Sequence, residues 1–222
     1  PNQDDAYAHQ KLQAESLIRS SSLEWTIFRL TYIVSPHKLA MDPLMFEMPL
    51  DTPLEVCSAE DAGLALARAV SSDLLLGRTV NLAGGVACRT TYADYLDRMT
   101  EAFGLGRRLL PPEAFGPGPF HCGFMDTGHA QEALQFQHDT LEAYYQRVSH
   151  AMRFKRPLYR LLRPVIRSVL TRRSPYLRSP RSTKAVRDPS PVRCGSVAGG
   201  KRVYPTRSAP HRPRTAPTRA TA

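Results

Sequence analysis

Long apolar runs are absent from this sequence, and so are closely spaced cysteines. No stretch of about 18 consecutive apolar residues occurs and no short run has the flanks of a secretory signal, so neither a membrane-spanning helix nor a signal peptide is predicted. The four cysteines are far apart and form no CxxC pair, which argues against a zinc ribbon and against a disulfide framework. This use of cysteine fits a reducing compartment, and we expect a cytoplasmic protein.

Glycine-rich and metal-ligand motifs are missing as well. Neither GxGxxG nor GxxGxxG occurs, and the Gly84-Gly85 step after a strand-like run is typical of an ordinary turn. The densest group of potential metal ligands lies in a run broken by glycines and lacks the two-ligand spacing of a helical site, so we expect no metal centre. Its members are His121, Cys122, His129 and His138.

Acidic residues are nearly absent from the last third of the chain. Residues 151–222 hold 19 Lys and Arg against a single acidic residue, whereas residues 1–150 hold 11 against 19. The formal net charge of +10 therefore comes from the end of the chain, and the part before it is acidic. A basic segment of this kind is compatible with contact to nucleic acid or to an anionic membrane surface.

The most informative feature that is present is a tyrosine, Tyr7, placed four residues before Lys11 in the helix-compatible run AYAHQKLQAESLIRSSS. Residues four apart on a helix lie on the same face, so the phenol and the ammonium can project into one site. A free tyrosine has a pKa of about 10. A nearby ammonium favours the phenolate, which eases proton exchange with a substrate hydroxyl or carbonyl. The spacing makes Tyr7 a candidate acid/base and Lys11 its tuner, but ordinary solvated helices show it too.

Several segments, in this order, resemble the short-chain dehydrogenase/reductase superfamily, in particular its extended and atypical epimerase/dehydratase branch. The first runs from Tyr7 and Lys11 through Ser20-Ser21-Ser22 and an apolar run to Arg29. The later ones are AEDAGLALARAV, RTVNLAGG, TTYADYLDRM and MDTGHAQEALQFQHDTLEAYYQRV. The resemblance covers residues 1–152, which we interpret as one domain.

The resemblance implies an α/β fold, namely the C-terminal part of a Rossmann-like doubly wound parallel sheet with small substrate-side elements. Members of the superfamily place a strand, a glycine-rich turn and a helix first, and the backbone N–H groups there hold the cofactor pyrophosphate. Because this chain enters the tyrosine-lysine helix almost at once, we interpret it as a truncated chain without the nucleotide half. We expect that chain to be inactive alone.

The resemblance also implies a site. Tyr7 would exchange the proton, Lys11 would hold the nicotinamide ribose, and the loop after the first strand would lie beside the nicotinamide. Besides Tyr7 and Lys11, the implied cofactor-binding residues are Leu30, Thr31, Tyr32 and Ile33. Many relatives have Arg-Pro where this chain has Arg29-Leu30, a change that backbone contacts tolerate better than side-chain contacts. The cofactor would be NAD or NADP, because the residue that decides between them lies in the missing half, as does the catalytic Ser or Thr.

The implied function is that of an NAD(P)-dependent oxidoreductase, epimerase or dehydratase acting on a sugar nucleotide or a similar small molecule with a hydroxyl or carbonyl group. One alternative is a non-catalytic NAD(P)-binding regulator or assembly factor of the same fold. Another is a protein whose basic end binds nucleic acid or a membrane surface. No recognised RNA-binding motif occurs, so we expect no firm nucleic-acid partner. The sequence leaves the oligomeric state open.

Local patterns predict alternating helices and strands. The expected strands are 25–34, covered on both faces, 54–57 and 79–82. The expected helices are 6–20, 58 or 60 to 70, 91–103, 126–134 and 138–152. Asp61 is expected to be structural, because it lies in a first helical turn, where a carboxylate meets the positive end of the helix dipole. Residues 37–53 are interpreted either as a wall of the substrate site or as a surface loop.

The composition changes after residue 152. Residues 153–170 form a basic amphipathic segment that could contact an anionic surface weakly, although Pro157 and Pro164 are expected to interrupt any continuous helix. Residues 171–222 are rich in Arg, Pro and Ser with few large apolar side chains, so we expect a disordered tail. A wrong-frame translation of a G+C-rich gene would have the same composition.

Overall fold

The computed structural model describes residues 6–36, 43–118, 120 and 122–178. Contacts divide the chain into two units, 1–182 and 183–222, and all described residues belong to the first. Expectations that fall on residues 179–222 therefore lie outside the described residues.

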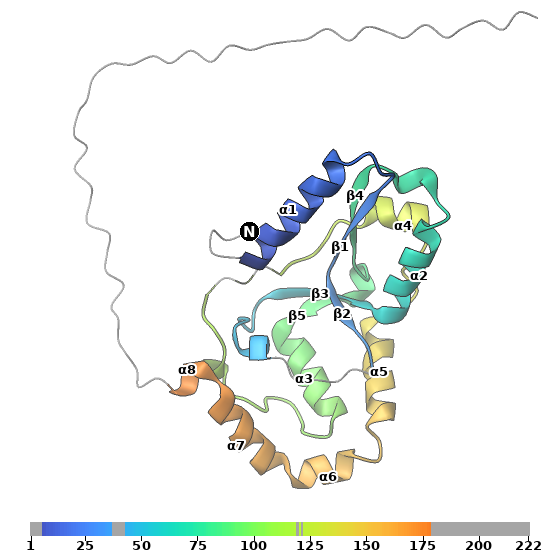
Figure 1. Cartoon of the computed structure of the whole chain (residues 1–222). Helices are drawn as coiled ribbons and strands as arrows, with labels where there is room; N and C mark the ends of the chain where they lie inside the picture. Colours follow the sequence, from blue (N-terminus) through green and yellow to red (C-terminus); the bar gives the residue numbers. More distant parts are fainter. Residues whose placement is uncertain (1–5, 37–42, 119, 121, 179–222) are drawn as a thin grey trace, which may run out of the picture. The chain divides into compact units, whose positions relative to one another are not determined.

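The first three elements form a helix followed by a strand that changes partners. Helix α1 (Ala6–Ser20) leads into β1 (Thr26–Leu30) and β2 (Tyr32–Val34), and Figure 1 shows α1 beside β1 and running in the opposite direction. β1 pairs in parallel with β4 (Arg78–Leu82), whereas β2 pairs in parallel with β3 (Pro53–Ser58). β3 also pairs antiparallel with the short β5 (Arg89–Thr91).

Thr31 lies where the chain moves from one sheet to the other. Its N–H donates to the Leu82 carbonyl oxygen at 3.0 Å, and its hydroxyl donates to the Glu55 carbonyl oxygen at 2.5 Å. One residue thus contacts both β4 and β3. The single strand predicted for residues 25–34 is therefore two strands that meet at this threonine.

The prediction that both faces of this strand are buried is wrong for its second half. Leu30, Tyr32 and Ile33 are exposed, and only Ile27 and Val34 are buried. Among the described residues, β1 pairs only with β4 and β2 only with β3, so both are edge strands, whose side chains have fewer neighbours.

Side-chain caps fix where the main helices begin. Helices α2 (Ala59–Ala69), α3 (Tyr92–Ala102) and α5 (Leu141–Ala151) each follow a Ser or Thr whose hydroxyl accepts a hydrogen bond from a backbone N–H three residues on. These caps are Ser58, Thr91 and Thr140. With α4 (Gly128–Leu134), these helices confirm the predicted α/β alternation. Short 3₁₀ turns join them: Pro43–Phe46, Asp73–Leu75, Val86–Cys88 and Pro112–Ala114.

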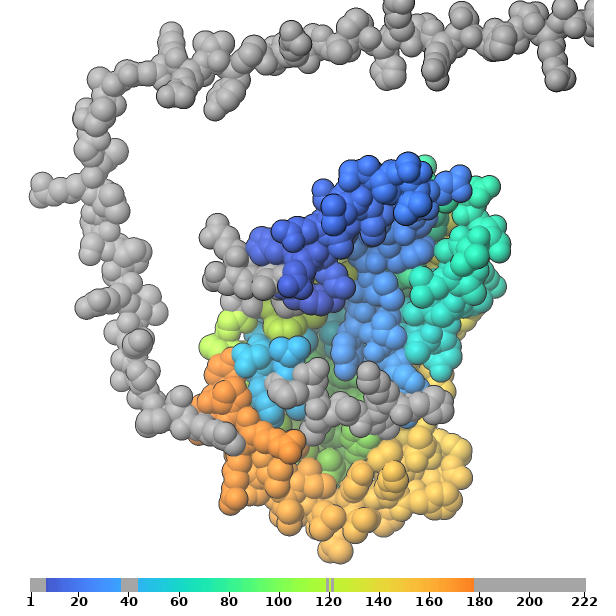
Figure 2. Space-filling view, viewed as in Figure 1, coloured from blue at the N-terminus to red at the C-terminus, as the bar shows by residue number. Residues whose placement is uncertain are grey.

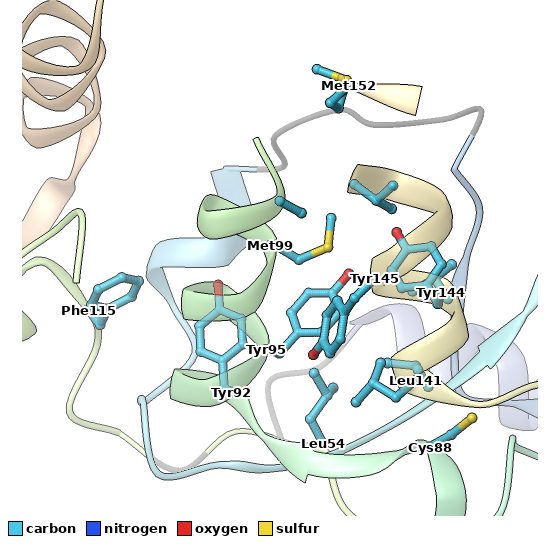
Figure 3. Close-up of a cluster of buried hydrophobic side chains, with 14 of the residues drawn as sticks. Leu54, Cys88, Tyr92, Tyr95, Met99, Phe115, Leu141, Tyr144, Tyr145 and Met152 are labelled. Atoms are coloured by element: carbon cyan, nitrogen blue, oxygen red, sulfur yellow. The ribbon is translucent and has the colours of Figure 1, made fainter. Parts of the chain in front are cut away.

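Two apolar clusters cover the sheet residues. A smaller one packs α2 and α4 on β4, with Leu82, Leu134 and Phe136 fully buried. The larger one joins α3 and α5 to β2 and β3 and is rich in tyrosine. Figure 3 shows its α3 residues, Tyr92, Tyr95 and Met99, beside Tyr144 and Tyr145 of α5.

Three further helices follow α5, and they revise the boundary expected after residue 170. α6 (Arg156–Leu161), α7 (Arg163–Arg173) and α8 (Pro175–Arg178) bring Leu170 into a cluster with Leu105 and Leu109. Ser174 is fully buried, and its hydroxyl donates to the Ala114 carbonyl oxygen at 2.6 Å. Residues 171–173 and 175–178 are therefore helical, and the segment is attached to the core rather than part of a disordered tail.

The interruption of a continuous helix that was expected at the prolines is present, because α6 ends at Leu161 and α7 begins at Arg163. Pro157 and Pro164 each occupy the first turn of their helix, α6 and α7. At that position the missing N–H costs nothing, because the first N–H groups of a helix have no partner within it. None of the helices in the described part of the chain is both long and apolar enough to cross a membrane.

Candidate functional site

An ion-pair cluster fixes α1 against one face of the β1–β4 pair. The buried carboxylate of Glu15 accepts hydrogen bonds from Arg29 Nε at 2.8 Å and Arg29 Nη2 at 2.7 Å. Arg19 adds a bond to the same carboxylate at 2.7 Å and also donates to Thr79 Oγ1 at 3.0 Å. The hydrogen bonds from Arg29 lower the pKa of Glu15 to about 2. Glu15 contacts β1 and Arg19 contacts β4. These two contacts determine where α1 lies on the sheet and which of its faces is turned towards the sheet.

Lys11 and Tyr7 lie on the face of α1 that also carries Glu15. Lys11 is one turn, and Tyr7 two turns, closer to the N-terminus of the helix than Glu15. At 1.5 Å per residue, Lys11 lies about 6 Å and Tyr7 about 12 Å beyond Glu15 along the helix. Because α1 runs opposite to β1, this advance towards the helix N-terminus follows the direction in which β1 runs (Figure 1). The two candidate catalytic residues therefore lie towards the carboxyl end of β1.

The structure brings Tyr7 and Lys11 together. The Lys11 ammonium lies over the Tyr7 ring, 5.2 Å from its centroid. Tyr7 is 68% exposed and Lys11 is also exposed, so both polar groups are accessible. Tyr7 and Lys11 therefore lie on the same face of α1, as their four-residue spacing predicts.

The four candidate residues at the strand differ in what their side chains do. Leu30, Tyr32 and Ile33 are exposed, and the Tyr32 ring packs edge-on against Tyr95 with centroids 6.4 Å apart. Thr31, in contrast, uses its hydroxyl and its N–H to hold the two sheets. Its side chain is therefore a structural bridge, and the accessible surface here comes from its neighbours.

Gly84 and Gly85 form a tight structural turn. The Gly84 N–H donates to the Val56 carbonyl oxygen at 2.9 Å, and the Gly85 N–H donates to Glu55 Oε1 at 3.0 Å. A Cβ at Gly84 would lie 2.5 Å from the Val56 oxygen, and Gly85 has a φ of +76°. Close approach and backbone geometry explain both glycines, and neither N–H is free to hold a phosphate.

Glu55 is a buried carboxylate that sequence reasoning missed. Besides the Gly85 N–H, it accepts hydrogen bonds from Arg89 Nε at 3.1 Å and from the Met125 N–H at 2.9 Å. Arg89 also donates to the Met125 carbonyl oxygen at 3.1 Å. This network ties the turn after β4 and the segment before α4 to β3. The only sequence signal was a single acidic residue inside the strand run PLEVCS.

Asp61 acts as a structural residue through a contact that the sequence did not reveal. Its buried Oδ2 accepts hydrogen bonds from the N–H groups of His138 and Asp139, at 3.1 and 3.0 Å. The side chain therefore joins the first turn of α2 to the segment that leads into α5.

The described thiols do not have the environment of a nucleophile. Burial raises the pKa of Cys57 to about 12 and that of Cys88 to about 11. Both thiols are therefore protonated at neutral pH. Within the described residues, which exclude His121, no cluster of three or more His, Cys, Asp or Glu side chains could hold a metal ion.

Comparisons with known proteins give a fold. No protein-family model and no curated protein matches the sequence. A short-chain dehydrogenase/reductase superfamily protein from Agrobacterium tumefaciens with bound NAD matches at 14% identity and a TM-score of 0.53, over 71% of this chain and 60% of that one. The fold is a partial Rossmann-like α/β fold. This confirms the fold class expected from the sequence.

A second similar structure is the UDP-N-acetylglucosamine 4-epimerase from Bacillus cereus, with 19% identity and a TM-score of 0.47, over 66% of this chain and 52% of that one. The chain thus spans 52% and 60% of the lengths of the two solved structures. Likeness at these identities concerns the fold alone.

Proposed function

We propose that this chain provides the catalytic tyrosine-lysine helix and the substrate side of an NAD(P)-dependent enzyme that acts on a sugar nucleotide or a similar hydroxyl or carbonyl substrate. The observation that carries the proposal is the placement of Tyr7 and Lys11. Both are accessible on one face of α1, and the Glu15–Arg29 pair holds that face towards the carboxyl end of a parallel strand. Ligands of open α/β sheets bind at the carboxyl ends of the strands.

The residues present fit the nicotinamide end of the cofactor. The Lys11 ammonium has three donors and can bind the ribose hydroxyls, and the exposed residues of β2 can flank the nicotinamide ring. The pyrophosphate end fits poorly, because the N–H groups of Gly84 and Gly85 already donate within the protein. In this proposal the pyrophosphate is held by a glycine-rich half that this sequence does not contain, and its strands extend the open edge of β1.

Tyr7 is the proton-transfer group in this proposal. Its Oη gives a proton to, or takes one from, the substrate oxygen while the bound nicotinamide accepts or donates a hydride. Lys11 orients the ribose. Glu15 and Arg29 act through α1 as positioning residues, because they set its rotation.

The proposal is tested by titrating NAD and NADP into the protein that joins this chain to a glycine-rich nucleotide half. We expect Tyr7→Phe to keep the cofactor affinity of the wild type, because the ring remains and only a hydroxyl is lost. Lys11→Met should weaken affinity by about tenfold, the value of one charge-assisted hydrogen bond, and it should also lower turnover. Lys155→Met, at the start of α6, is the control and should change neither quantity.

Two results would contradict the proposal. One is an unchanged cofactor affinity in Lys11→Met. The other is micromolar affinity for NAD or NADP in the isolated chain, because that would require a pyrophosphate site among residues that show none.

A further inference from the structure

Helices α6 and α7 carry an exposed apolar stripe. Leu158, Leu162, Val165 and Val169 follow the spacing of one helical face and are all exposed, and Phe154 and Leu161 add side chains that are 80% and 76% exposed. Figure 2 shows α7 in orange at the surface of the described part. Other residues of these helices, Tyr159, Ile166 and Leu170, contact the core. The stripe therefore plays no part in holding the helices to the core.

The same helices have a one-sided charge. Residues 153–178 contain nine Lys and Arg and no Asp or Glu. Among the described residues, the ion pairs use arginines of other elements. Arg156 of α6 donates to Ser149 Oγ, and the other five arginines of α6 and α7 are unpaired within the described part of the chain. They are Arg160, Arg163, Arg167, Arg172 and Arg173. Exposed cations and large exposed apolar side chains thus occur on the same two helices, and residues 153–178 contain no carboxylate side chain.

We propose that α6 and α7 form a docking surface for an anionic lipid membrane. A helix lies in the interface when its apolar side chains enter the boundary between headgroups and acyl chains and its cations contact anionic headgroups. A nucleic acid would use the arginines but would leave Phe154, Leu161 and Val165 in water, because its outer surface is a phosphate backbone. The chain's own residues 179–222 are an unsuitable occupant, since they carry ten Lys and Arg and one Asp and would repel these helices. The proposal does not depend on the proposed catalytic function.

The first experiment asks which helix enters the lipid. Tryptophan is introduced into the full chain as Val165→Trp and, as a control, as Val70→Trp at an exposed position just after α2. Both proteins are mixed with vesicles of phosphatidylcholine and phosphatidylglycerol in equal amounts that carry brominated acyl chains. We expect the brominated chains to quench the new fluorescence of Val165→Trp and to leave that of Val70→Trp unchanged. The native Trp25 is common to both.

The second experiment separates the two parts of the surface by measuring vesicle binding of the full chain. Phe154→Ser with Leu161→Ser should weaken binding about tenfold, because each side chain loses its burial in lipid. The matched control is Val70→Ser with Leu74→Ser, whose native side chains are 89% and 69% exposed, and it should bind like the wild type. Arg160→Gln with Arg167→Gln should also weaken binding by about tenfold or more. Vesicles of phosphatidylcholine alone should not bind.

Several outcomes would overturn the proposal. Equal quenching of the two introduced tryptophans, or none in Val165→Trp, would show that α7 does not enter the lipid. Unchanged binding in both the apolar and the arginine variants would assign binding to residues 179–222. Binding to an oligonucleotide without binding to the anionic vesicles would assign the surface to nucleic acid.

Discussion

At the scale of single residues, two tyrosines of the larger core differ in what their hydroxyls contact. The Tyr92 hydroxyl donates to the Met45 carbonyl oxygen at 2.8 Å, whereas the Tyr145 hydroxyl is buried and has no hydrogen-bond partner among the described residues. A buried polar group without a partner costs free energy, and one with a partner contributes a little. Similar rings in one cluster therefore contribute differently to stability.

We expect Tyr145→Phe to leave the free energy of unfolding unchanged or to raise it by up to about 1 kcal/mol, because the change removes an unpaired hydroxyl. Tyr92→Phe should lower it by about 1 kcal/mol, because the Met45 oxygen loses its donor. Urea unfolding of the two variants beside the wild type measures both values. Equal destabilisation in the two variants would mean that the Tyr145 hydroxyl has a partner.

Residues differ in how much of their role the sequence reveals. Tyr7 and Lys11 could be predicted because their relation is local: a four-residue spacing on a helix determines it. Glu55 could not, because its partners, Gly85, Arg89 and Met125, come from two distant segments. A single carboxylate in an apolar strand indicates neither its burial nor its donors.

At the scale of elements, the attachment of α1 depends on one buried carboxylate. Hydrogen bonds from Arg29 lower the pKa of Glu15 from its ordinary value of 4.5 to about 2 in the folded protein. A carboxylate with a lowered pKa stabilises the fold fully above its unfolded pKa, and this contribution is lost as the pH falls through the folded pKa. The relevant window for Glu15 therefore runs from pH 4.5 down to about 2.

We expect Glu15→Gln to lower the free energy of unfolding by about 1 kcal/mol above pH 4.5, a modest value because Arg19 and Arg29 are partly exposed to screening solvent. The difference from the wild type should shrink as the pH falls towards 2. Urea unfolding at several pH values measures it. Glu24→Gln, an exposed position after α1, is the control and should follow the wild-type curve. A constant difference at all pH values would contradict the role of the Glu15 charge.

Elements were predictable where their signals are local. The starts of α2, α3 and α5 were predicted to within three residues, because the capping residues, Ser58, Thr91 and Thr140, adjoin their helices in the sequence. The break at Thr31 was not predictable, because Leu82 and Glu55, which define it, belong to other strands. The break between α6 and α7 was predictable from Pro157 and Pro164, because proline interrupts a helix interior but is accepted in a first turn.

At the scale of the whole molecule, the folded unit extends past the change in composition at residue 153. Buried Ser174 contacts Ala114, and the Tyr176 hydroxyl donates to the Glu47 carboxylate. The composition of residues 171–178 resembles that of residues 179–222, so composition alone does not reveal the contacts of Ser174 and Tyr176. Charge and hydropathy alone placed the boundary too early.

Two truncations test this boundary. Ending the chain after Ser182 should leave the thermal transition unchanged, because the removed residues have too few large apolar side chains to add a core. Ending it after Leu170 should cost about 2 kcal/mol or more and lower the Tm by roughly 4–8 °C, because the contacts of Ser174 and Tyr176 are lost. Calorimetry of both chains measures this. Equal Tm values would show that α8 contributes nothing to the folded unit.

The central claim is that Tyr7 transfers the proton, and the rate of hydride transfer in a single turnover tests it most directly. The measurement compares wild type, Tyr7→Phe and Tyr176→Phe, an α8 control, in the protein that joins this chain to its nucleotide half. We expect a rate at least about 100-fold lower in Tyr7→Phe, the usual contribution of a positioned acid or base, and an unchanged rate in Tyr176→Phe. A Tyr7→Phe rate near that of the wild type would contradict the account and leave Tyr7 as an ordinary residue on the surface of α1.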